Sequence, residues 1–198
     1  MIVFCYHDYN YVYLLGLGNV QGGKKCSGNP LMYNGKLCGS TTRYHDSHKG
    51  ACGCGHGDTP FGWNQNNYVA AANQMFFDSG RRTWCGSKCG HCVRLTTTGG
   101  YVDGQGGPTR GGESKIFMVT NLCPAVDPNM AWCAQSAAPW DGGANTFGYA
   151  YHFDLENGGH QIDRLNWNNP EVTVDEVSCD GHESMTPTSG YYSQCECH

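Results

Sequence analysis

Hydrophobic and polar residues alternate along this chain in short runs that are separated by glycine-rich turns. Four runs rich in β-branched and aromatic residues are typical of strands: Val93–Thr98, Lys115–Asn121, Phe147–Leu155 and Glu171–Ser178. A helical period occurs in Asn66–Ser79, where apolar residues recur on one helical face. These residues are Tyr68, Ala72, Met75 and Phe76. The pattern therefore predicts a mostly β barrel or sandwich with one or two short helices.

The composition adds a disulfide framework to this prediction. The 198 residues include 13 cysteines, and Cys5 stands apart in a segment unlike the rest. The other twelve are enough for six disulfides, which persist outside reducing compartments, so a secreted, extracellular protein is expected. Cys52-x-Cys54-x-His56 and Cys85-x3-Cys89-x2-Cys92 also offer zinc ligands. Only one CxxC spacing occurs, so disulfides are favoured, and no metal or other cofactor is expected.

Charge and chain organisation exclude several classes of protein. The formal charge is −5 and only 15% of residues are charged, which argues against a nucleic-acid partner. Residues 1–21 hold no Lys or Arg and contain the apolar run VYLLGLG, which is too short to span a bilayer. We interpret them as an atypical signal-like segment or an irregular extension. Residues 22–198 are expected to form a single β-barrel domain, monomeric and without a membrane partner.

Two segments place a carboxylate beside aromatic residues. In an extended Thr41–Asp46 segment, Thr42, Tyr44 and Asp46 share one face. The alternative for Asp46 is a surface residue that caps the turn at Ser47.

The second segment is Tyr149–Leu155. As a strand, it places His152 and Asp154 on the face opposite Tyr149, Tyr151 and Phe153. A carboxyl in such apolar surroundings tends to hold its proton, as a general acid must. The alternative is a loop carboxylate hydrogen-bonded to backbone.

A third strand ends at Asn121, which is able to orient a water molecule or a sugar hydroxyl, although a structural Asn at a strand end is the commoner case. Two placed carboxyls are the minimum for cleaving a glycosidic bond. Aromatic rings that offer platforms for sugars are Tyr44, Trp63, Trp140, Tyr151 and Trp167. Together these features favour a carbohydrate-active enzyme.

At these residues the sequence resembles glycoside hydrolase family 45, the small inverting endo-β-1,4-glucanases. Thr42-Arg43-Tyr44-His45-Asp46 is similar to the family's T-R-Y-W-D signature, and Lys49 and Cys52 fit its K-x-x-C continuation. Phe153-Asp154-Leu155 resembles the F-D-I segment that carries the catalytic acid, and Asn168-Asn169-Pro170 with Val177 and Cys179 resembles the last strand. The likeness runs from about Cys26 to Cys197 and is greatest to the short cellulases of molluscs.

The resemblance implies a six-stranded double-psi β-barrel, stapled by disulfides, with an open cleft that binds β-1,4-glucans such as cellulose, carboxymethylcellulose and cello-oligosaccharides. It implies Asp154 as general acid and Asp46 as general base, with Asn121 as a residue that assists or replaces the base. Candidate substrate-binding residues are Tyr44, Thr42, Lys49, Trp63, His152 and Trp140.

The sequence departs from the family pattern in two places. Ser47 and His48 stand where two cysteines are frequent, so the disulfide network differs from the fungal one. Asp141 is a poor match to the family's additional loop Asp.

Two other classes remain open. The segments around Asn121 and Asp154 also resemble expansins, which loosen cell walls without measurable hydrolysis; they lack the first Asp, so Asp46 favours a hydrolase. The third class is a secreted, cysteine-rich binding module or inhibitor.

Overall fold

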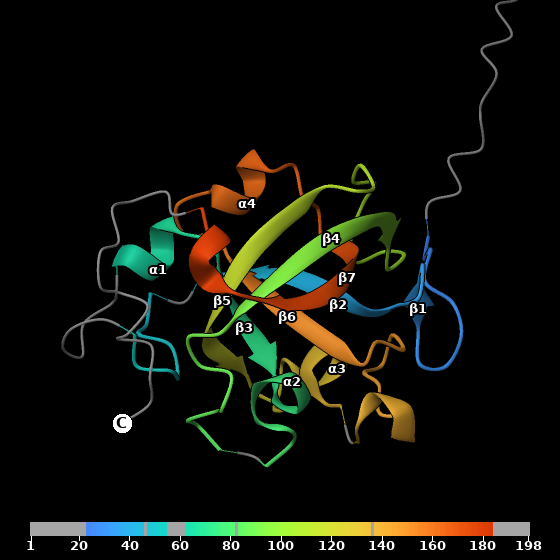
Figure 1. The fold of residues 1–198 in the computed structure, drawn as a ribbon, viewed down its shortest axis with the longest axis horizontal. Helices are drawn as coiled ribbons and strands as arrows, with labels where there is room; N and C mark the ends of the chain where they lie inside the picture. The colour runs from blue at the N-terminus through green and yellow to red at the C-terminus, as the bar shows by residue number, and fades with distance from the viewer. Residues whose placement is uncertain (1–22, 46, 55–61, 82, 136, 184–198) are drawn as a thin grey trace, which may run out of the picture.

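Six strands close into a ring in the computed structural model, which describes residues 23–45, 47–54, 62–81, 83–135 and 137–183 (Figure 1). The strands are β2 (Lys36–Tyr44), β3 (Val69–Asn73), β4 (Cys92–Tyr101), β5 (Ser114–Cys123), β6 (Tyr151–Glu156) and β7 (Pro170–Val177). Around the ring their order is β2–β6–β3–β5–β4–β7, and β7 pairs back to β2. The pairs β2–β6 and β3–β5 are parallel and the other four are antiparallel. The predicted six-stranded double-psi β-barrel is confirmed.

Short elements decorate the barrel. Strand β1 (Met32–Tyr33) forms a hairpin with β2 through Asn34 and Gly35, both at positive φ, as a tight two-residue turn requires. The helices are α1 (Gly62–Asn66), α2 (Gln74–Asp78), α3 (Met130–Cys133) and α4 (Gln161–Arg164), with 3₁₀ turns η1 (Pro139–Asp141) and η2 (Cys179–Gly181). In Figure 1, α4 lies at the top of the barrel, and α2 and α3 lie at the bottom. None of the described helices has the length and apolar character needed to cross a membrane.

The predicted helix at Asn66–Ser79 is wrong over most of its length. Val69–Asn73 is strand β3, buried at all five positions and paired with β5 on one side and β6 on the other. Only Gln74–Asp78 is helical. The alanine-rich sequence favours a helix locally, but pairing inside the barrel overrides that preference.

Three of the four predicted strands are confirmed as β4, β5 and β7, and the fourth is shorter than predicted. Strand β6 begins at Tyr151 rather than Phe147. Before it, Asn145 Oδ1 accepts the backbone N–H groups of Phe147 and Tyr149, both at 3.0 Å. This Asn-centred turn satisfies the backbone groups that a strand would otherwise have paired.

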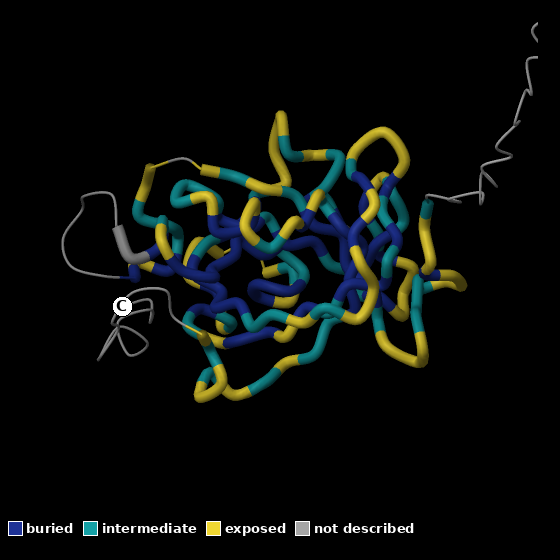
Figure 2. Tube along the Cα trace, turned by 90° about the horizontal axis from the view of Figure 1, so that it is seen from above, coloured by how far each residue is buried: buried dark blue, intermediate teal, exposed yellow. Residues whose placement is uncertain are grey.

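The core is made of side chains from all six barrel strands and from the helices and loops beside them, and Figure 2 shows the buried segments, in dark blue, at the centre of the molecule. Its largest fully enclosed side chains include Trp167, Phe77, Phe117, Phe153 and Leu95. Trp167 is only 2% exposed, and its ring centroid lies 5.8 Å from that of Phe117. The prediction that Trp167 offers a platform for sugars is therefore wrong, because its ring is a core element.

Disulfides staple the barrel and its loops. Four join described residues: Cys26–Cys38, Cys52–Cys89, Cys92–Cys179 and Cys123–Cys133. Cys54 and Cys85 are disulfide-bonded as well, so all ten cysteines of the described ranges are oxidised. Cys5, Cys195 and Cys197 lie outside those ranges. The disulfide interpretation is confirmed, since sulfur atoms that are joined to each other are not thiolate ligands for zinc.

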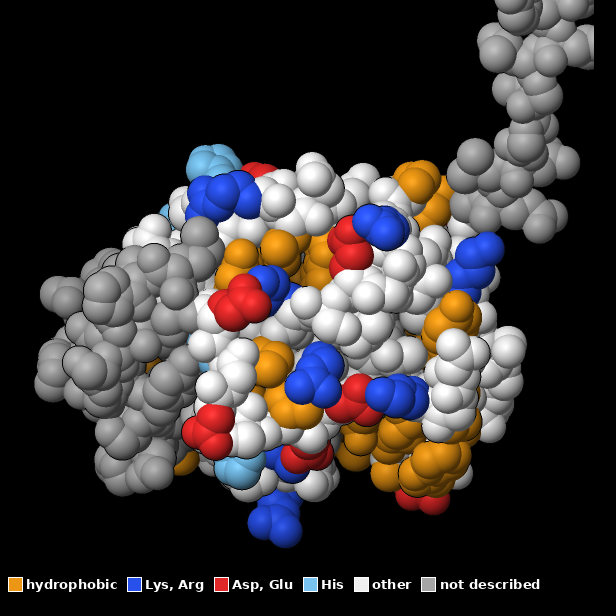
Figure 3. Space-filling view, turned by 45° about the horizontal axis from the view of Figure 1, so that its top comes forward, with side chains coloured by type: hydrophobic (Ala, Val, Ile, Leu, Met, Phe, Trp, Pro, Cys, Tyr) orange, Lys and Arg blue, Asp and Glu red, His pale blue; other side chains and the backbone are white. Residues whose placement is uncertain are grey.

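The surface carries its charges as mixed pairs. Figure 3 shows basic side chains next to acidic ones on the face it presents, with hydrophobic side chains between them. Lys36–Asp175, Lys88–Glu176 and Lys115–Glu183 are ion pairs at 2.5–2.6 Å. Exposed pairs of this kind contribute little stability individually.

Candidate active site

A row of four residues crosses the outer wall of the barrel. Asp154 on β6 is paired with Thr42 on β2 and, on its other side, with Ala71 on β3. Ala71 is in turn paired with Asn121 on β5. Directly paired residues point to the same face of a sheet. We call Thr42, Asp154, Ala71 and Asn121 the polar row.

The row faces outward because its strand neighbours face inward. Phe153 and Leu155 flank Asp154 along β6 and are at most 1% exposed, within the core. Since side chains alternate along a strand, Asp154 points away from that core. Adjacent strands lie about 4.8 Å apart, so the backbones of Asp154 and Asn121 are separated by about 10 Å, with only a methyl group between them.

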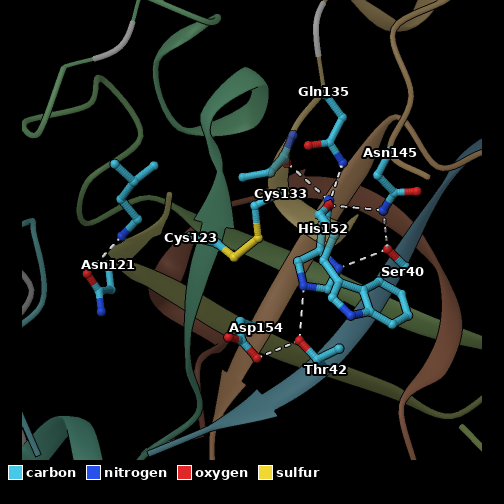
Figure 4. Close-up of a disulfide and its surroundings, with 12 residues drawn as sticks. Ser40, Thr42, Asn121, Cys123, Cys133, Gln135, Asn145, His152 and Asp154 are labelled. Carbon is cyan, nitrogen blue, oxygen red and sulfur yellow. Dashed lines mark hydrogen bonds between the residues drawn. A yellow bond between two sulfur atoms is a disulfide. The ribbon is translucent and has the colours of Figure 1, made fainter. Parts of the chain in front are cut away.

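Hydrogen bonds hold Asp154 from the β2 side (Figure 4). The Thr42 hydroxyl donates to Asp154 Oδ1 at 2.6 Å and contacts His152 Nε2 at 3.0 Å. His152 Nδ1 lies 2.9 Å from the Ser40 hydroxyl. A hydroxyl has one proton, so when Thr42 donates to an ionised Asp154, Nε2 of His152 must carry the hydrogen and donate to Thr42. Nδ1 then accepts from Ser40.

Asn145 sets the direction of this chain of hydrogen bonds. Its Oδ1 is occupied by the two backbone N–H groups of the turn before β6, so its Nδ2 is the donor to Ser40 Oγ at 3.0 Å. Each member therefore donates toward Asp154. This arrangement keeps Oδ1 of the carboxyl as a hydrogen-bond acceptor and fixes the orientation of the side chain.

His152 is a structural part of this chain. It is 0% exposed, and its ring stacks on Trp132 with centroids 5.2 Å apart. Burial lowers the pKa of His152 to about 3. A neutral imidazole agrees with the hydrogen-bond directions above. The prediction that His152 contacts substrate is wrong, because the side chain has no accessible surface.

Asn121 is held by its oxygen. Oδ1 accepts the backbone N–H groups of Ala51 at 2.7 Å and Leu122 at 2.9 Å. The outer end of its amide is therefore the Nδ2 donor, which makes no hydrogen bond within the described part of the chain. Such a group orients a water molecule or sugar hydroxyl by donating to its oxygen, and it does not accept a proton.

Asp46 lies outside the described residues, but the segments on both sides of it are anchored. On one side, His45 Nδ1 lies 2.9 Å from Oε1 of the buried Glu156. On the other side, Cys52 N–H donates to Thr120 O at 3.2 Å. A Cβ at Gly50 would lie 2.4 Å from that same carbonyl oxygen, so only glycine allows this close approach.

The predicted substrate-binding residues are spread over several environments. Tyr44 is half-buried and packs against Ala71, Cys123 and Cys133, next to the polar row. Trp140 on η1 is 68% exposed. Lys49 is half-buried, and the side chain of Trp63 is outside the described atoms. Tyr151 packs on Phe76 with ring centroids 5.1 Å apart.

No metal site follows from the donor groups. Among the described residues, the atoms close enough to share an ion belong to Cys123, Cys133 and His152. The two sulfurs form a disulfide with each other, and His152 Nε2 and Nδ1 are both engaged by hydroxyls. The set does not have the free lone pairs that a metal needs.

Sequence reasoning missed three members of the site: Ser40, Ala71 and Asn145. Ser40 lies two residues before Thr42, and the period of a strand places it on the same face. Ala71 was hidden by the incorrect helix prediction. Asn145 lies in a glycine-rich loop, and its contacts with β2 come from tertiary structure alone.

Fold and site together define a double-psi β-barrel that carries an aspartate, held in one orientation by hydrogen bonds, on its outer wall. Residues 39–184 match the family model described as EXPB1-like domain 1. An endoglucanase of Mytilus edulis is 59% identical over 179 residues, covering 88% of this chain and 98% of that protein. Endoglucanase-5 of Hypocrea jecorina is 45% identical over 123 residues, covering 59% of this chain and 48% of that protein.

Solved structures agree with the sequence relatives. The β-1,4-D-endoglucanase Cel45A of the blue mussel Mytilus edulis is 58% identical with a TM-score of 0.81, over 88% of this chain and 99% of that one. A GH45 endoglucanase in complex with cellobiose is 46% identical with a TM-score of 0.77, over 87% and 97%. The chain belongs to glycoside hydrolase family 45.

Proposed function

We propose that the protein is an inverting endo-β-1,4-glucanase that hydrolyses internal β-1,4-glucosidic bonds of cellulose. The observation that carries the proposal is the placement of Asp154, which is oriented by Thr42 and lies opposite Asn121 across Ala71. The endoglucanase of Mytilus edulis, which this chain matches over nearly the whole length of that protein, supports the substrate class.

Asp154 is the general acid. Thr42 donates to its Oδ1, so Oδ2 is the oxygen that carries the proton. Oδ2 gives that proton to the glycosidic oxygen as the bond to the anomeric carbon breaks. The leaving glucose unit then departs as a neutral hydroxyl group.

Asp46 is the general base. It removes a proton from a water molecule, whose oxygen forms the new bond to the anomeric carbon from the opposite face of the sugar. Asn121 Nδ2 assists by donating to the oxygen of that water or of an adjacent hydroxyl. Because the water must fit between base and sugar, the two carboxyls should lie about 6.5–9.5 Å apart.

The setting of the reaction follows from the rest of the chain. We propose that the protein is secreted and acts outside the cell as a monomer, on cellulose, carboxymethylcellulose and cello-oligosaccharides. The oxidised cysteines support an extracellular location. Tyr44 beside the polar row supports stacking of a sugar ring close to the bond that is cleaved.

A second function is favoured by one observation, the match to the EXPB1-like barrel domain. An expansin-like protein would bind cell-wall glucan without cleaving it. Hydrolysis separates the two functions, because an expansin-like protein releases no reducing sugar.

Two measurements test the proposal. Reducing sugar should be released from carboxymethylcellulose, and proton NMR of the earliest products should show the α-anomer. Asp46→Asn should be severely impaired, and Asp46→Asn combined with Asn121→Ala should be worse. A fresh β-anomer would rule out inversion. If Asp46→Asn kept full activity while Asn121→Ala was inactive, the assignment of Asp46 as the base would be wrong.

A further inference from the structure

An open groove of 460 Å³ lies at the end of the barrel that carries α2 and α3. Its first side comes from α2 and the loop that follows, and its second side comes from the segment after β5 through α3. Among the described residues, the lining side chains that bear on binding are Gln74, Thr83, Trp84, Val126, Met130 and Gln135. We call this the uncharged groove, since none of these side chains is ionisable.

Exposed hydrophobic side chains gather in the groove. Among the described residues, four large hydrophobic side chains are exposed, and three of them line it: Trp84 at 69%, Val126 at 56% and Met130 at 45%. A concentration of exposed apolar surface marks an interaction site. Its polar groups are two amides and a hydroxyl, from Gln74, Gln135 and Thr83. These groups recognise a ligand through neutral hydrogen bonds.

The loop that presents Trp84 is firmly held. The Asp78 carboxylate accepts the backbone N–H groups of Arg81 and Thr83 and the Thr83 hydroxyl, at 2.7–2.9 Å. Burial alone would raise the pKa of Asp78, but hydrogen bonds, with that from Thr83 the largest, bring it below its usual value. Cys85, next to Trp84, is disulfide-bonded. An exposed indole on a loop fixed in this way is organised for binding in advance.

The groove adjoins the candidate active site. Cys123, two residues beyond Asn121 on β5, lies on the same face as the polar row, and Pro124, which follows it, lines the groove. The Cys123–Cys133 disulfide joins β5 to α3 between the two sites, and it packs against Ala71 and Tyr44 on the side of the row. A chain-like ligand that crosses the polar row along β5 therefore reaches the groove next.

We propose that the uncharged groove binds a segment of the same β-1,4-glucan chain, with a pyranose ring stacked on Trp84. This inference rests on the proposed function for its ligand. A glucan is uncharged, has apolar ring faces and carries hydroxyls at its edges, so each property matches the lining. The groove thereby holds polymeric substrate away from the reacting bond, and its contribution grows with chain length.

The test uses the full chain with Asp154→Asn, which leaves cello-oligosaccharides uncleaved during titration. Calorimetry with cellohexaose compares this protein with versions that also carry Trp84→Ala or Trp84→Phe. Trp84→Ala should weaken cellohexaose binding about five- to tenfold, as expected for loss of one aromatic stacking contact. Trp84→Phe, which keeps a ring, should stay within about twofold. Val126→Lys, which adds a charge, should also weaken binding, whereas Val126→Thr, of matched size, should not.

Three results would overturn the proposal. The first is equal cellohexaose affinity with and without Trp84→Ala, and the second is no saturable binding to Asp154→Asn. The third is a wild-type dimer in sedimentation velocity that Trp84→Ala converts to monomer, because a second copy would then occupy the groove. Carboxymethylcellulose hydrolysis by the wild type is scored separately. If cellohexaose binding depends on Trp84 but the wild type hydrolyses no carboxymethylcellulose, the proposal for the groove stands and the proposed activity is rejected.

Discussion

The polar row and the uncharged groove lie side by side, yet they are built in opposite ways. Behind the row, Asn145, Ser40 and His152 are all buried, and they are hydrogen-bonded in that order. In the groove, the characteristic side chains are exposed and apolar, and the hydrogen bonds are used to hold the loop backbone instead.

The difference reflects what each site has to do. Proton transfer needs a carboxyl held in one orientation, and a buried hydrogen-bond chain supplies that at the cost of leaving every member dependent on its neighbours. Stacking on a sugar needs an accessible ring, whose contribution is largely independent of the residues around it. Changes in the row should therefore be large and coupled, and changes in the groove small and additive.

The largest effect is expected from Asp154→Asn. An amide has no proton to give to the leaving oxygen, so kcat on carboxymethylcellulose should fall about 10²–10⁴-fold, near the upper end for an unactivated glycoside. Cellohexaose binding should survive, since the rings of the site and the groove remain. Asp175→Asn, a carboxyl in an exposed ion pair with Lys36, is the control and should leave kcat unchanged. If Asp154→Asn kept a kcat near that of the wild type, the assignment of Asp154 as the general acid would be wrong.

The second comparison uses two disulfides that close loops of similar length. Cys123–Cys133 spans 10 residues between the row and the groove, whereas Cys26–Cys38 spans 12 residues beside β1. Replacing either pair by serine should cost about 2–4 kcal/mol of unfolding free energy, measured in urea. Only loss of Cys123–Cys133 should also lower kcat and cellohexaose affinity at 10 °C. Equal activity of the two variants would show that this disulfide contributes stability alone.

Thr42 tests whether the hydrogen-bond chain acts on the carboxyl. Thr42→Val removes the donor to Asp154 and leaves His152 Nε2–H without an acceptor, which should destabilise the fold by about 1–3 kcal/mol. The ionised form of Asp154 also loses a donor, so the alkaline limb of the kcat/KM profile should move to higher pH. Thr42→Ser should restore both values. A profile that does not move in Thr42→Val would limit Thr42 to a structural role.

The sequence predicts which side chains of this site share a strand face, but it does not predict the contacts between distant segments. Period-2 alternation placed Thr42 and Tyr44 on one face and His152 and Asp154 on another, and the strands confirm the extended segments. The same alternation gave no means of separating a buried imidazole from an accessible one. Burial of His152 depends on Trp132 of α3 and on Ser40 of β2, which tertiary structure brings against its ring.

The incorrect helix prediction at Asn66–Ser79 has the same cause, since tertiary pairing there overrides the local preference. Val69–Asn73 has a helix-forming composition, and its strand conformation comes from partners on both sides in β5 and β6. That error concealed Ala71, whose small side chain separates Asp154 from Asn121. The uncharged groove was equally hidden, because Trp84 and Met130 are 46 residues apart and only the fold brings them together.

The smallest expected effect is a pH dependence that belongs to the row and not to the groove. The pKa of His152 is about 3 in the folded protein, against about 6.5 for a free imidazole. Between these values the unfolded chain binds a proton that the folded chain does not. Stability is therefore full above pH 6.5 and falls as the pH is lowered, by about 1.4 kcal/mol per pH unit. Urea unfolding between pH 7 and 5 measures this slope, and His182, whose pKa burial also lowers, adds to it in the same direction.

His182→Asn should therefore keep most of the slope, and Trp84→Ala should keep all of it. Histidine NMR gives the direct assignment, because the His152 ring resonances should stay constant down to pH 4. A His152 resonance that titrates near pH 6.5 would mean that the imidazole is not sealed beneath the row.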